Sequence, residues 1–297
     1  MRHFLEVDDL AEAELAEVLD LADPARAEPV LAGRGVALIF EKPSNRTRSS
    51  SELAVVGLGG HPVTMRGDEL GLGSRETVED VTKVLARYHA IVGARVFDHR
   101  LLEAMARVDE VPVVNLLSDF SHPTQVLADL LTLRSRWGSL PGRTVAWVGD
   151  GNNVARSLLL GCALSGMSLR LACPPGHAVD PGAVLRARSM GVEVVETSDP
   201  KAAVEGADAV YTDVWVSMGQ EEEAPQRLEA FAGYQVDADL MARAAPGALF
   251  LHCLPAHRGL EVSAEVIDGP ASAVWDQAEN RMHAARGLFL WLARAAG

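Results

Sequence analysis

Short apolar runs alternate with amphipathic stretches along the chain, and this alternation predicts most of its secondary structure. The apolar runs predict strands over residues 36–40, 62–65, 90–97, 111–117, 143–149, 168–173, 192–197, 208–214 and 248–253. Apolar positions with helical spacing predict helices over residues 5–22, 45–56, 76–88, 99–108, 123–137, 153–165, 181–190, 199–206, 237–245 and 277–295. In the helix at 76–88, the residues expected to be buried are Val78, Val81, Val84 and Leu85. Strands that alternate with helices of about ten residues indicate an α/β fold with doubly wound parallel sheets.

A turn-rich segment near the middle of the chain predicts two domains. Residues 137–142 read Trp-Gly-Ser-Leu-Pro-Gly, which is typical of a stop after a helix, and the chain of 297 residues is longer than one typical domain. We therefore expect residues 1–138 and 139–276 to form two doubly wound parallel-sheet domains. The last helix, at 277–297, is expected to pack back on the first domain.

Composition narrows the class of protein. Hydrophobic residues make up 48% of the chain, and 27 Lys and Arg stand against 41 Asp and Glu, a net charge of −14. Such a surface would repel nucleic acid and anionic membranes, so neither is an expected partner. The apolar runs are too short to span a bilayer, the amino terminus lacks a signal-peptide pattern, and three cysteines without metal-like spacing suggest thiols in a reducing compartment. We expect a soluble, cytoplasmic protein.

The segment Ser44-Asn45-Arg46-Thr47-Arg48 is the most informative polar stretch. It follows an expected strand and opens an expected helix, so it combines backbone N–H groups, hydroxyls and a guanidinium at one point. Basic residues are unfavourable at a helix amino terminus unless an anion offsets them. The alternative is an ordinary capped helix with a solvated basic first turn. The pattern favours a phosphate site.

Three later polar segments also fall at expected strand ends or helix starts. His122 and Gln125, in His-Pro-Thr-Gln, could donate to a carbonyl or phosphate oxygen, although His122 could be a plain cap. Asp213 leaves a strand and could pair with a substrate ammonium, or cap a loop. Cys253, in His-Cys-Leu-Pro, stands where open α/β sheets bind ligands, although a small buried Cys is the default. A zinc site from His252, Cys253 and His257 is disfavoured, because neighbouring strand side chains point to opposite faces and no fourth ligand is near.

The segment Gly149-Asp150-Gly151 resembles the start of a dinucleotide fingerprint. It follows a strand and opens a helix, but the third glycine is missing, and no acidic residue ends the next strand. The motif is therefore weak support for an NAD-dependent dehydrogenase.

Taken together, these segments resemble the ornithine carbamoyltransferase family. The likeness runs from about residue 36 to Arg281, and its motifs are Ser-Asn-Arg-Thr-Arg at 44–48, Arg95, His-Pro-Thr-Gln at 122–125, Asp-x-x-x-Ser-Met-Gly at 213–219 and His-Cys-Leu-Pro at 252–255. The phosphate segment and His-Pro-x-Gln are shared with aspartate carbamoyltransferases, whereas Ser-Met-Gly and His-Cys-Leu-Pro are the ornithine-type markers.

The resemblance implies transfer of a carbamoyl group from carbamoyl phosphate to the δ-amine of L-ornithine, giving L-citrulline and phosphate, in arginine biosynthesis or in a catabolic pathway. The residues that match the family's carbamoyl phosphate site are Ser44, Asn45, Arg46, Thr47, Arg95, His122, Gln125 and Arg281. Those that match its ornithine site are Asn153, Asp213, Ser217, Met218, Cys253 and Leu254. The catalytic roles would fall to Arg95, His122, Asp213 and Cys253, without a metal or organic cofactor, since nothing is oxidised or reduced. The family assembles as a homotrimer or a multiple of trimers.

Two departures from the family pattern leave alternatives open. Asn45 stands where Thr is usual, and the loop at 66–76 lacks the Gln that reaches a neighbouring subunit's site; Arg66, Glu69, Ser74 or Arg75 could replace it. A catalytically weak, carbamoyl phosphate-binding relative is therefore one alternative. Independently of these departures, putrescine or an acylated ornithine could replace ornithine as the acceptor. Asp213 and the Ser-Met-Gly loop favour a free amino acid, although close paralogues share parts of this loop.

Overall fold

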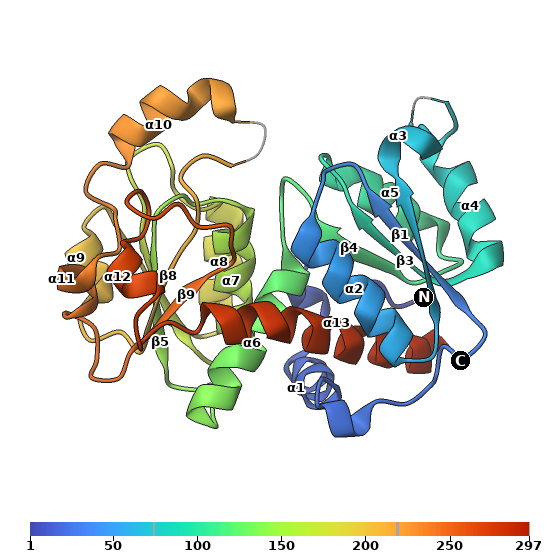
Figure 1. Ribbon diagram of the computed structural model, residues 1–297, viewed down its shortest axis with the longest axis horizontal. Coiled ribbons are helices and arrows are strands. Elements are labelled where there is room, and N and C mark those ends of the chain that lie inside the picture. Colours follow the sequence, from blue (N-terminus) through green and yellow to red (C-terminus); the bar gives the residue numbers. More distant parts are fainter. Residues whose placement is uncertain (74, 218–219, 297) are drawn as a thin grey trace. The chain divides into compact units, whose positions relative to one another are not determined.

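The computed structural model describes residues 1–73, 75–217 and 220–296, and it divides into two compact units. Unit 1 comprises Met1–Leu131 and Glu279–Gly297, and unit 2 comprises Thr132–Ala278. Each unit holds one parallel sheet with helices on both of its faces (Figure 1). The expected α/β fold with two doubly wound parallel sheets is confirmed.

The sheet of unit 1 has the strand order β2-β1-β3-β4. Its strands are β1 (Gly35–Phe40), β2 (His61–Arg66), β3 (His89–Arg95) and β4 (Val113–Leu117). The helices of its sequence range are η1 (Val7–Asp9), α1 (Glu12–Leu21), η2 (Pro24–Arg26), α2 (Asn45–Gly57), α3 (Gly67–Leu70), α4 (Val78–Tyr88), α5 (His99–Val108), α6 (Pro123–Trp137, shared with unit 2) and α13 (Val274–Ala296, mostly unit 1). Since crossovers between parallel strands are right-handed, α2 lies on one face and α4 and α5 on the other. The chain reverses its direction of winding between β1 and β3, which makes their carboxyl ends the switch point of this sheet.

Alternating strand residues build the core of unit 1. Ala37, Ile39, Val92 and Ala94 point to the face that α4 and α5 cover. On α4 the side chains of Val78, Val81 and Leu85 are buried as expected, whereas Val84 was expected to be buried and is 47% exposed. The prediction for Val84 was wrong because Thr82, with no exposed surface, continues the buried stripe in its place.

The carboxyl-terminal helix α13 packs closely on α1. Gly287 allows this contact, because a Cβ at that position would lie 2.5 Å from the carbonyl oxygen of Val18. Two polar contacts hold the same helix: Arg286 Nη2 donates to the Ala22 carbonyl oxygen at 2.5 Å, and Trp291 Nε1 donates to Glu17 Oε2 at 3.1 Å.

The sheet of unit 2 has the strand order β7-β6-β5-β8-β9. Its strands are β5 (Thr144–Val148), β6 (Ser168–Ala172), β7 (Val194–Thr197), β8 (Ala209–Thr212) and β9 (Leu249–His252). Its helices are α7 (Asn153–Leu164), α8 (Pro181–Ser189), α9 (Pro200–Val204), η3 (Glu221–Glu223), α10 (Ala224–Ala230), α11 (Ala238–Met241) and α12 (Ala264–Ile267). The winding reverses between β5 and β8, so their carboxyl ends form the second switch point.

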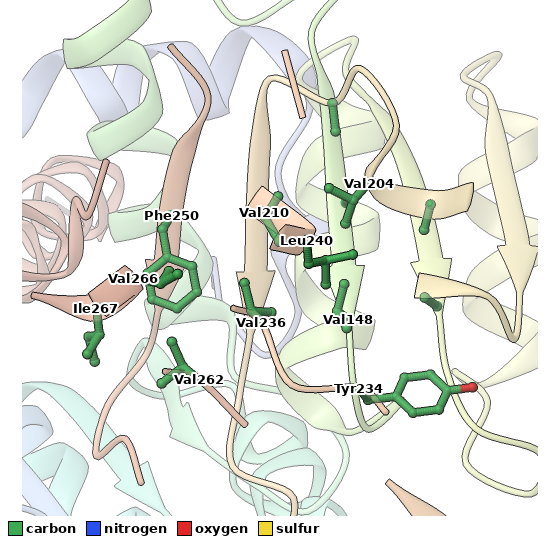
Figure 2. Close-up of a cluster of buried hydrophobic side chains, with 14 of the residues drawn as sticks. Val148, Val204, Val210, Tyr234, Val236, Leu240, Phe250, Val262, Val266 and Ile267 are labelled. Carbon is green, nitrogen blue, oxygen red and sulfur yellow. The ribbon is translucent and has the colours of Figure 1, made fainter. Parts of the chain in front are cut away.

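An apolar cluster of unit 2 lies on one face of its sheet (Figure 2). Val148, Val210 and Phe250 of the strands pack there against Val204 of α9 and Leu240 of α11. This packing fixes the ends of β5, β8 and β9, from which the polar residues of unit 2 project.

The structure differs from the expected elements mainly in short helices. The helix α3 lies in the segment at 66–76 that was expected to be a loop, and no helix was predicted over α10 and α12. The helix expected at 237–245 ends at Met241. The two units divide between Leu131 and Thr132, inside α6, whereas the sequence placed a boundary after 138, at the end of this helix. In the part of the chain that the structure describes, every helix is too short or too polar to cross a lipid bilayer.

Candidate functional site

The amino terminus of α2 is a polar helix start. Ser44 is its N-cap, and Ser44 Oγ accepts from Thr47 N at 3.2 Å. The first turn carries no acidic residue, so no side chain there offsets the partial positive charge of the helix end, which can stabilise a bound anion. Asn45 is exposed, and its Oδ1 accepts from Ser49 Oγ at 3.3 Å. Arg48 pairs with Glu52 one turn on, at 2.9 Å, on the solvent side of the helix.

Arg281 of α13 joins the polar residues of unit 1. Its Nη2 donates to Thr47 Oγ1 at 3.0 Å, and its Nη1 donates to Gln125 Oε1 at 2.8 Å and lies 3.4 Å from His122 Nε2. Arg95, at the end of β3, donates to the same Thr47 Oγ1 at 3.4 Å. All five side chains are buried. Residues far apart in the sequence thus meet at the carboxyl edge of the sheet, beside the start of α2.

The electrostatics of His122 show how positive this cluster is. Burial and the charges of Arg281, Arg95 and Arg46 hold the pKa of His122 well below its ordinary value. The imidazole is therefore neutral near pH 7 and can donate through one N–H. Burial is the main cause of this neutrality, and the three nearby guanidinium charges add a positive field that suits a bound anion.

Replacing His122 by asparagine should flatten the pH dependence of stability. Unfolded His122 takes up a proton near pH 6.5, whereas the folded residue does so only at lower pH. Its contribution to stability is therefore fully present above about pH 6.5 and falls with decreasing pH, at up to ~1.4 kcal/mol per pH unit. We expect urea unfolding to show that the free energy of unfolding decreases less between pH 7.5 and pH 5.5 in His122→Asn than in the unmodified chain. Equal losses in the two proteins would contradict the low pKa of His122.

A second polar cluster lies at the switch point of unit 2. Asp213 follows β8, and its Oδ1 accepts from Cys253 Sγ at 2.9 Å and from Val214 N at 2.8 Å. Its Oδ2 accepts from Asn152 Nδ2 at 2.9 Å, and Asn152 Oδ1 caps α7 by accepting from Val154 N and Ala155 N. Asn152 therefore fixes the carboxylate to the start of α7. The sequence had singled out Asn153 instead, which is the first residue of α7.

Buried His252 and Glu261 support the backbone beside Cys253. His252 Nδ1 accepts from Leu254 N at 2.8 Å, and Nε2 lies 3.2 Å from Glu261 Oε1. Leu254 has a φ of 59°, in the left-handed region that L-residues with bulky side chains rarely adopt. The contact from His252 helps to hold this conformation. Glu261 was not singled out from the sequence, because it pairs with His252 across a loop that has no regular pattern.

The described residues include one group whose ligand-type atoms lie within 4.8 Å of one another: Asp213, His252 and Cys253. Both ring nitrogens of His252 are engaged by Leu254 N and Glu261, and Cys253 donates to Asp213. The hydrogen bonds of this group are therefore those of a protein network rather than of a metal centre.

Arg227 of α10 anchors the loop that follows Asp213. It forms an ion pair with buried Asp150, and its Nε donates to the Trp215 carbonyl oxygen at 2.6 Å. The side chain of Arg227 is only 7% exposed, so this is a buried anchor. No sequence motif indicated Arg227, which lies in a helix that was not predicted.

The same geometry accounts for the glycines of the Gly149-Asp150-Gly151 segment. Gly151 N donates to the His177 carbonyl oxygen at 2.8 Å, and a Cβ on Gly151 would lie 2.3 Å from Val179 N. The chain's own loop thus occupies the space beside this glycine, where a dinucleotide fingerprint would receive a pyrophosphate. Gly151 is required for packing of that loop, which removes the motif's support for a dehydrogenase.

Of the three cysteines, Cys253 is the partly exposed one, whereas Cys162 and Cys173 are buried. Burial, together with the charge of Asp150, raises the pKa of Cys173 to about 12. Cys173 is therefore a thiol of low reactivity near neutral pH.

The remaining candidate residues lie in the loop after β8 and in the loop at 66–76. Ser217 N donates to Gln220 Oε1 at 3.1 Å. Met218 and Ser74 lie outside the described residues. In the loop at 66–76, Arg66 pairs with Asp68 at 2.6 Å and Arg75 with Glu76 at 3.3 Å, and both arginines are exposed.

Comparisons with known proteins agree on one family over both units. Residues 2–135 match the carbamoyl-P binding domain of aspartate/ornithine carbamoyltransferases, and residues 141–292 match the Asp/Orn binding domain of the same family. The chain is 51% identical over 308 residues to an ornithine carbamoyltransferase of Acidothermus cellulolyticus, covering 100% of this chain and 98% of the relative. It is 47% identical over 300 residues to that of Methanoculleus marisnigri, covering 98% and 96%.

The chain also has the same fold as solved structures of ornithine carbamoyltransferases. The ornithine carbamoyltransferase of Thermus thermophilus is 46% identical with a TM-score of 0.90, covering 98% of this chain and 99% of that chain. The enzyme of Pyrococcus furiosus is 42% identical with a TM-score of 0.94, covering 99% and 97%.

Proposed function

Because the chain belongs to the aspartate/ornithine carbamoyltransferase family, we propose that it transfers the carbamoyl group of carbamoyl phosphate to the δ-amine of L-ornithine, giving L-citrulline and phosphate. Relatives named ornithine carbamoyltransferase match it over nearly its full length. The observation that carries the proposal is the cluster of Thr47, Arg95, His122 and Arg281 beside a helix amino terminus. It provides both an anion site and several donors for a carbonyl oxygen.

In this proposal unit 1 binds carbamoyl phosphate. The phosphate would lie at the start of α2, and the residues that hold it are Ser44, Asn45, Arg46 and Thr47. The carbamoyl group would be held by Arg95, His122, Gln125 and Arg281. Attack of the amine turns the carbonyl oxygen into an oxyanion, and each preorganised donor stabilises it by about 3–4 kcal/mol. Because His122 is neutral, it donates without adding a competing charge.

Unit 2 would bind ornithine through Asp213, with Asn153, Ser217, Met218, Cys253 and Leu254 completing the site. A lysine-like amine has a pKa near about 10.4, so roughly one molecule in a thousand is neutral at pH 7. Asp213 and Cys253, whose Sγ lies 2.9 Å from Asp213 Oδ1, would position the amine and help to remove its proton. The new C–N bond forms as the bond from the carbamoyl carbon to the phosphate oxygen breaks, and phosphate leaves.

Arg46→Ala should weaken carbamoyl phosphate binding far more than Arg48→Ala. Arg46 contributes to the positive field at His122, and a lost charge-assisted contact to phosphate should raise KM about 30-fold. Arg48 is 57% exposed and pairs with Glu52, so its loss should change KM less than about twofold. Steady-state kinetics with carbamoyl phosphate as the varied substrate provides the test. Equal losses from both variants would mean that the phosphate lies elsewhere along α2.

The assembly and the compartment are part of the proposal. We infer a homotrimer or a multiple of trimers in the cytoplasm, without a cofactor. Phe97 and Phe120 of unit 1 are 52% and 39% exposed and line a hollow of about 560 Å³ at the carboxyl edge of the sheet, which suits contact with another subunit. Light scattering of the purified chain would report the assembly, and a monomer would contradict it.

The reaction itself is tested with ¹³C-labelled carbamoyl phosphate and L-ornithine. We expect the label to appear in citrulline, with phosphate released in equal amount. Two alternative functions predict other outcomes: the first follows from Asn45 and the loop at 66–76, and the second from the Ser-Met-Gly loop, parts of which related carbamoyltransferases share. Binding of carbamoyl phosphate without citrulline would identify a catalytically weak relative, and turnover only with putrescine or an acylated ornithine would identify a different acceptor.

A further inference from the structure

Gln125 lies between two charged groups that fix its orientation. Its Nε2 donates to Asp129 Oδ1 at 2.8 Å, one turn on in α6, and its Oε1 accepts from Arg281 Nη1 at 2.8 Å. Asp129 has no exposed surface, and Gln125 is 3% exposed. The sequence did not predict this arrangement, because Asp129 belongs to no motif that was singled out.

The chemistry of the two neighbours leaves one orientation for the amide. An ionised carboxylate only accepts hydrogen bonds, and a guanidinium only donates them. Rotation of the amide by 180° would place its NH₂ against the Arg281 guanidinium and its oxygen against the Asp129 carboxylate. Both contacts would then be repulsive, so Gln125 Oε1 is held toward Arg281.

We propose that Asp129 is a specificity-determining residue, which positions Gln125 so that its amide oxygen reads the NH₂ group of the carbamoyl donor. This inference rests on the proposed function. An amide oxygen has two lone pairs, of which one receives Arg281, and the other can accept from a carbamoyl N–H. Thr47, Arg95 and His122 supply donors for the carbonyl oxygen, so the site distinguishes the two ends of the carbamoyl group by polarity.

The consequence is discrimination against acyl phosphates that lack an N–H group. Acetyl phosphate has the same carbonyl and phosphate, but it presents a methyl group to Gln125 Oε1. A buried acceptor left without its donor weakens binding, and sites built around a hydrogen bond reject analogues that cannot form it. Asp129 would thus act through Gln125 and not by touching the substrate.

Asp129→Ala tests this role with three ligands. We expect KM for carbamoyl phosphate to rise about tenfold, because the amide loses its fixed orientation. The inhibition constants of acetyl phosphate and inorganic phosphate should change less than about twofold, since the start of α2 is intact. Asp80→Ala is the matched control: this carboxylate is 66% exposed and forms a long ion pair with Lys83 at 3.8 Å, so all three constants should be unchanged. Parallel weakening of all three ligands in Asp129→Ala would overturn the proposal and indicate a general structural role.

A pair of isosteric substitutions provides a second test, which remains valid if Asp129→Ala does not fold. Gln125→Glu places two carboxylates in contact and should reduce kcat/KM for carbamoyl phosphate about 100-fold. In the double variant Gln125→Glu with Asp129→Asn, the new asparagine can donate to the new carboxylate, and an oxygen still faces Arg281. We expect the double variant to recover to within about tenfold of the unmodified chain and to keep its preference over acetyl phosphate. No recovery would refute the inference.

Failure of this inference is distinguishable from failure of the proposed function. If the unmodified chain forms no citrulline, the proposed function fails. If it forms citrulline and the double variant is no better than Gln125→Glu, only the role of Asp129 fails.

Discussion

Arg281→Ala is expected to lower kcat/KM for carbamoyl phosphate by about 10³-fold. The substitution removes a guanidinium that contacts Thr47 and Gln125 and lies beside His122, all of them buried. One lost donor to a developing oxyanion already costs about 10²–10³ in rate, and here the orientation of Gln125 is lost as well. Steady-state kinetics of citrulline formation at saturating ornithine measures the effect.

The matched control for this variant lies on the same helix. Arg294, near the end of α13, forms an ion pair with Glu28 and is 40% exposed. Arg294→Ala should leave kcat/KM within about twofold of the unmodified value, because exposed ion pairs contribute little. A loss of less than tenfold in Arg281→Ala, with the fold intact by circular dichroism, would show that Arg281 does not contact the carbamoyl group.

Asp213→Asn is expected to lower kcat/KM for ornithine by about 10³-fold. The carboxylate accepts from Cys253 on one oxygen and from Asn152 on the other, so an asparagine must turn its NH₂ group toward one of these donors. It also loses the negative charge that would pair with a substrate ammonium, a contact whose loss costs about 2–5 kcal/mol when buried. Kinetics with ornithine as the varied substrate, at saturating carbamoyl phosphate, measures the effect.

Asp208 offers a matched control for Asp213. It precedes β8 and accepts from Arg143 Nη1 at 2.7 Å and from Thr144 N at 2.8 Å. Asp208→Asn should cost about 1 kcal/mol of stability and leave kcat/KM for ornithine within about twofold. If Asp208→Asn and Asp213→Asn lowered kcat/KM equally, the effect of Asp213→Asn would be one of folding and not of binding.

The fold could be predicted from the sequence because most of its strands are short, apolar and buried, whereas the edge strands β2 and β7 are more exposed. In a doubly wound sheet both faces are covered, so each strand appears as a continuous apolar run, and each crossover helix is amphipathic. The elements that were missed, α3, α10 and α12, are short, and nothing in their local pattern separates them from loops. Val84 was misassigned because a threonine, Thr82, takes a buried position that an apolar pattern cannot reveal.

The candidate site was predictable where its residues lie at strand ends. Arg95 is the last residue of β3, Asp213 directly follows β8, and His122 immediately precedes α6, after the loop that leaves β4. Parallel strands bring their carboxyl ends to one edge of a sheet. The supporting residues could not be found in this way. Asn152, Arg227 and Glu261 act through contacts between segments that the fold brings together, and no period or motif in their sequence neighbourhoods indicates these contacts. Asp129 contacts Gln125 one turn away in α6, but it belongs to no motif that was singled out.

The most direct test of the central claim compares acceptor amines at one fixed concentration of carbamoyl phosphate. The measurement is kcat/KM, with products identified by mass spectrometry, for L-ornithine, putrescine, N-acetylornithine and L-aspartate. The account predicts citrulline from ornithine, with ornithine preferred over every other amine by more than about tenfold. A higher kcat/KM for any other acceptor, or no carbamoylated product at all, would contradict it.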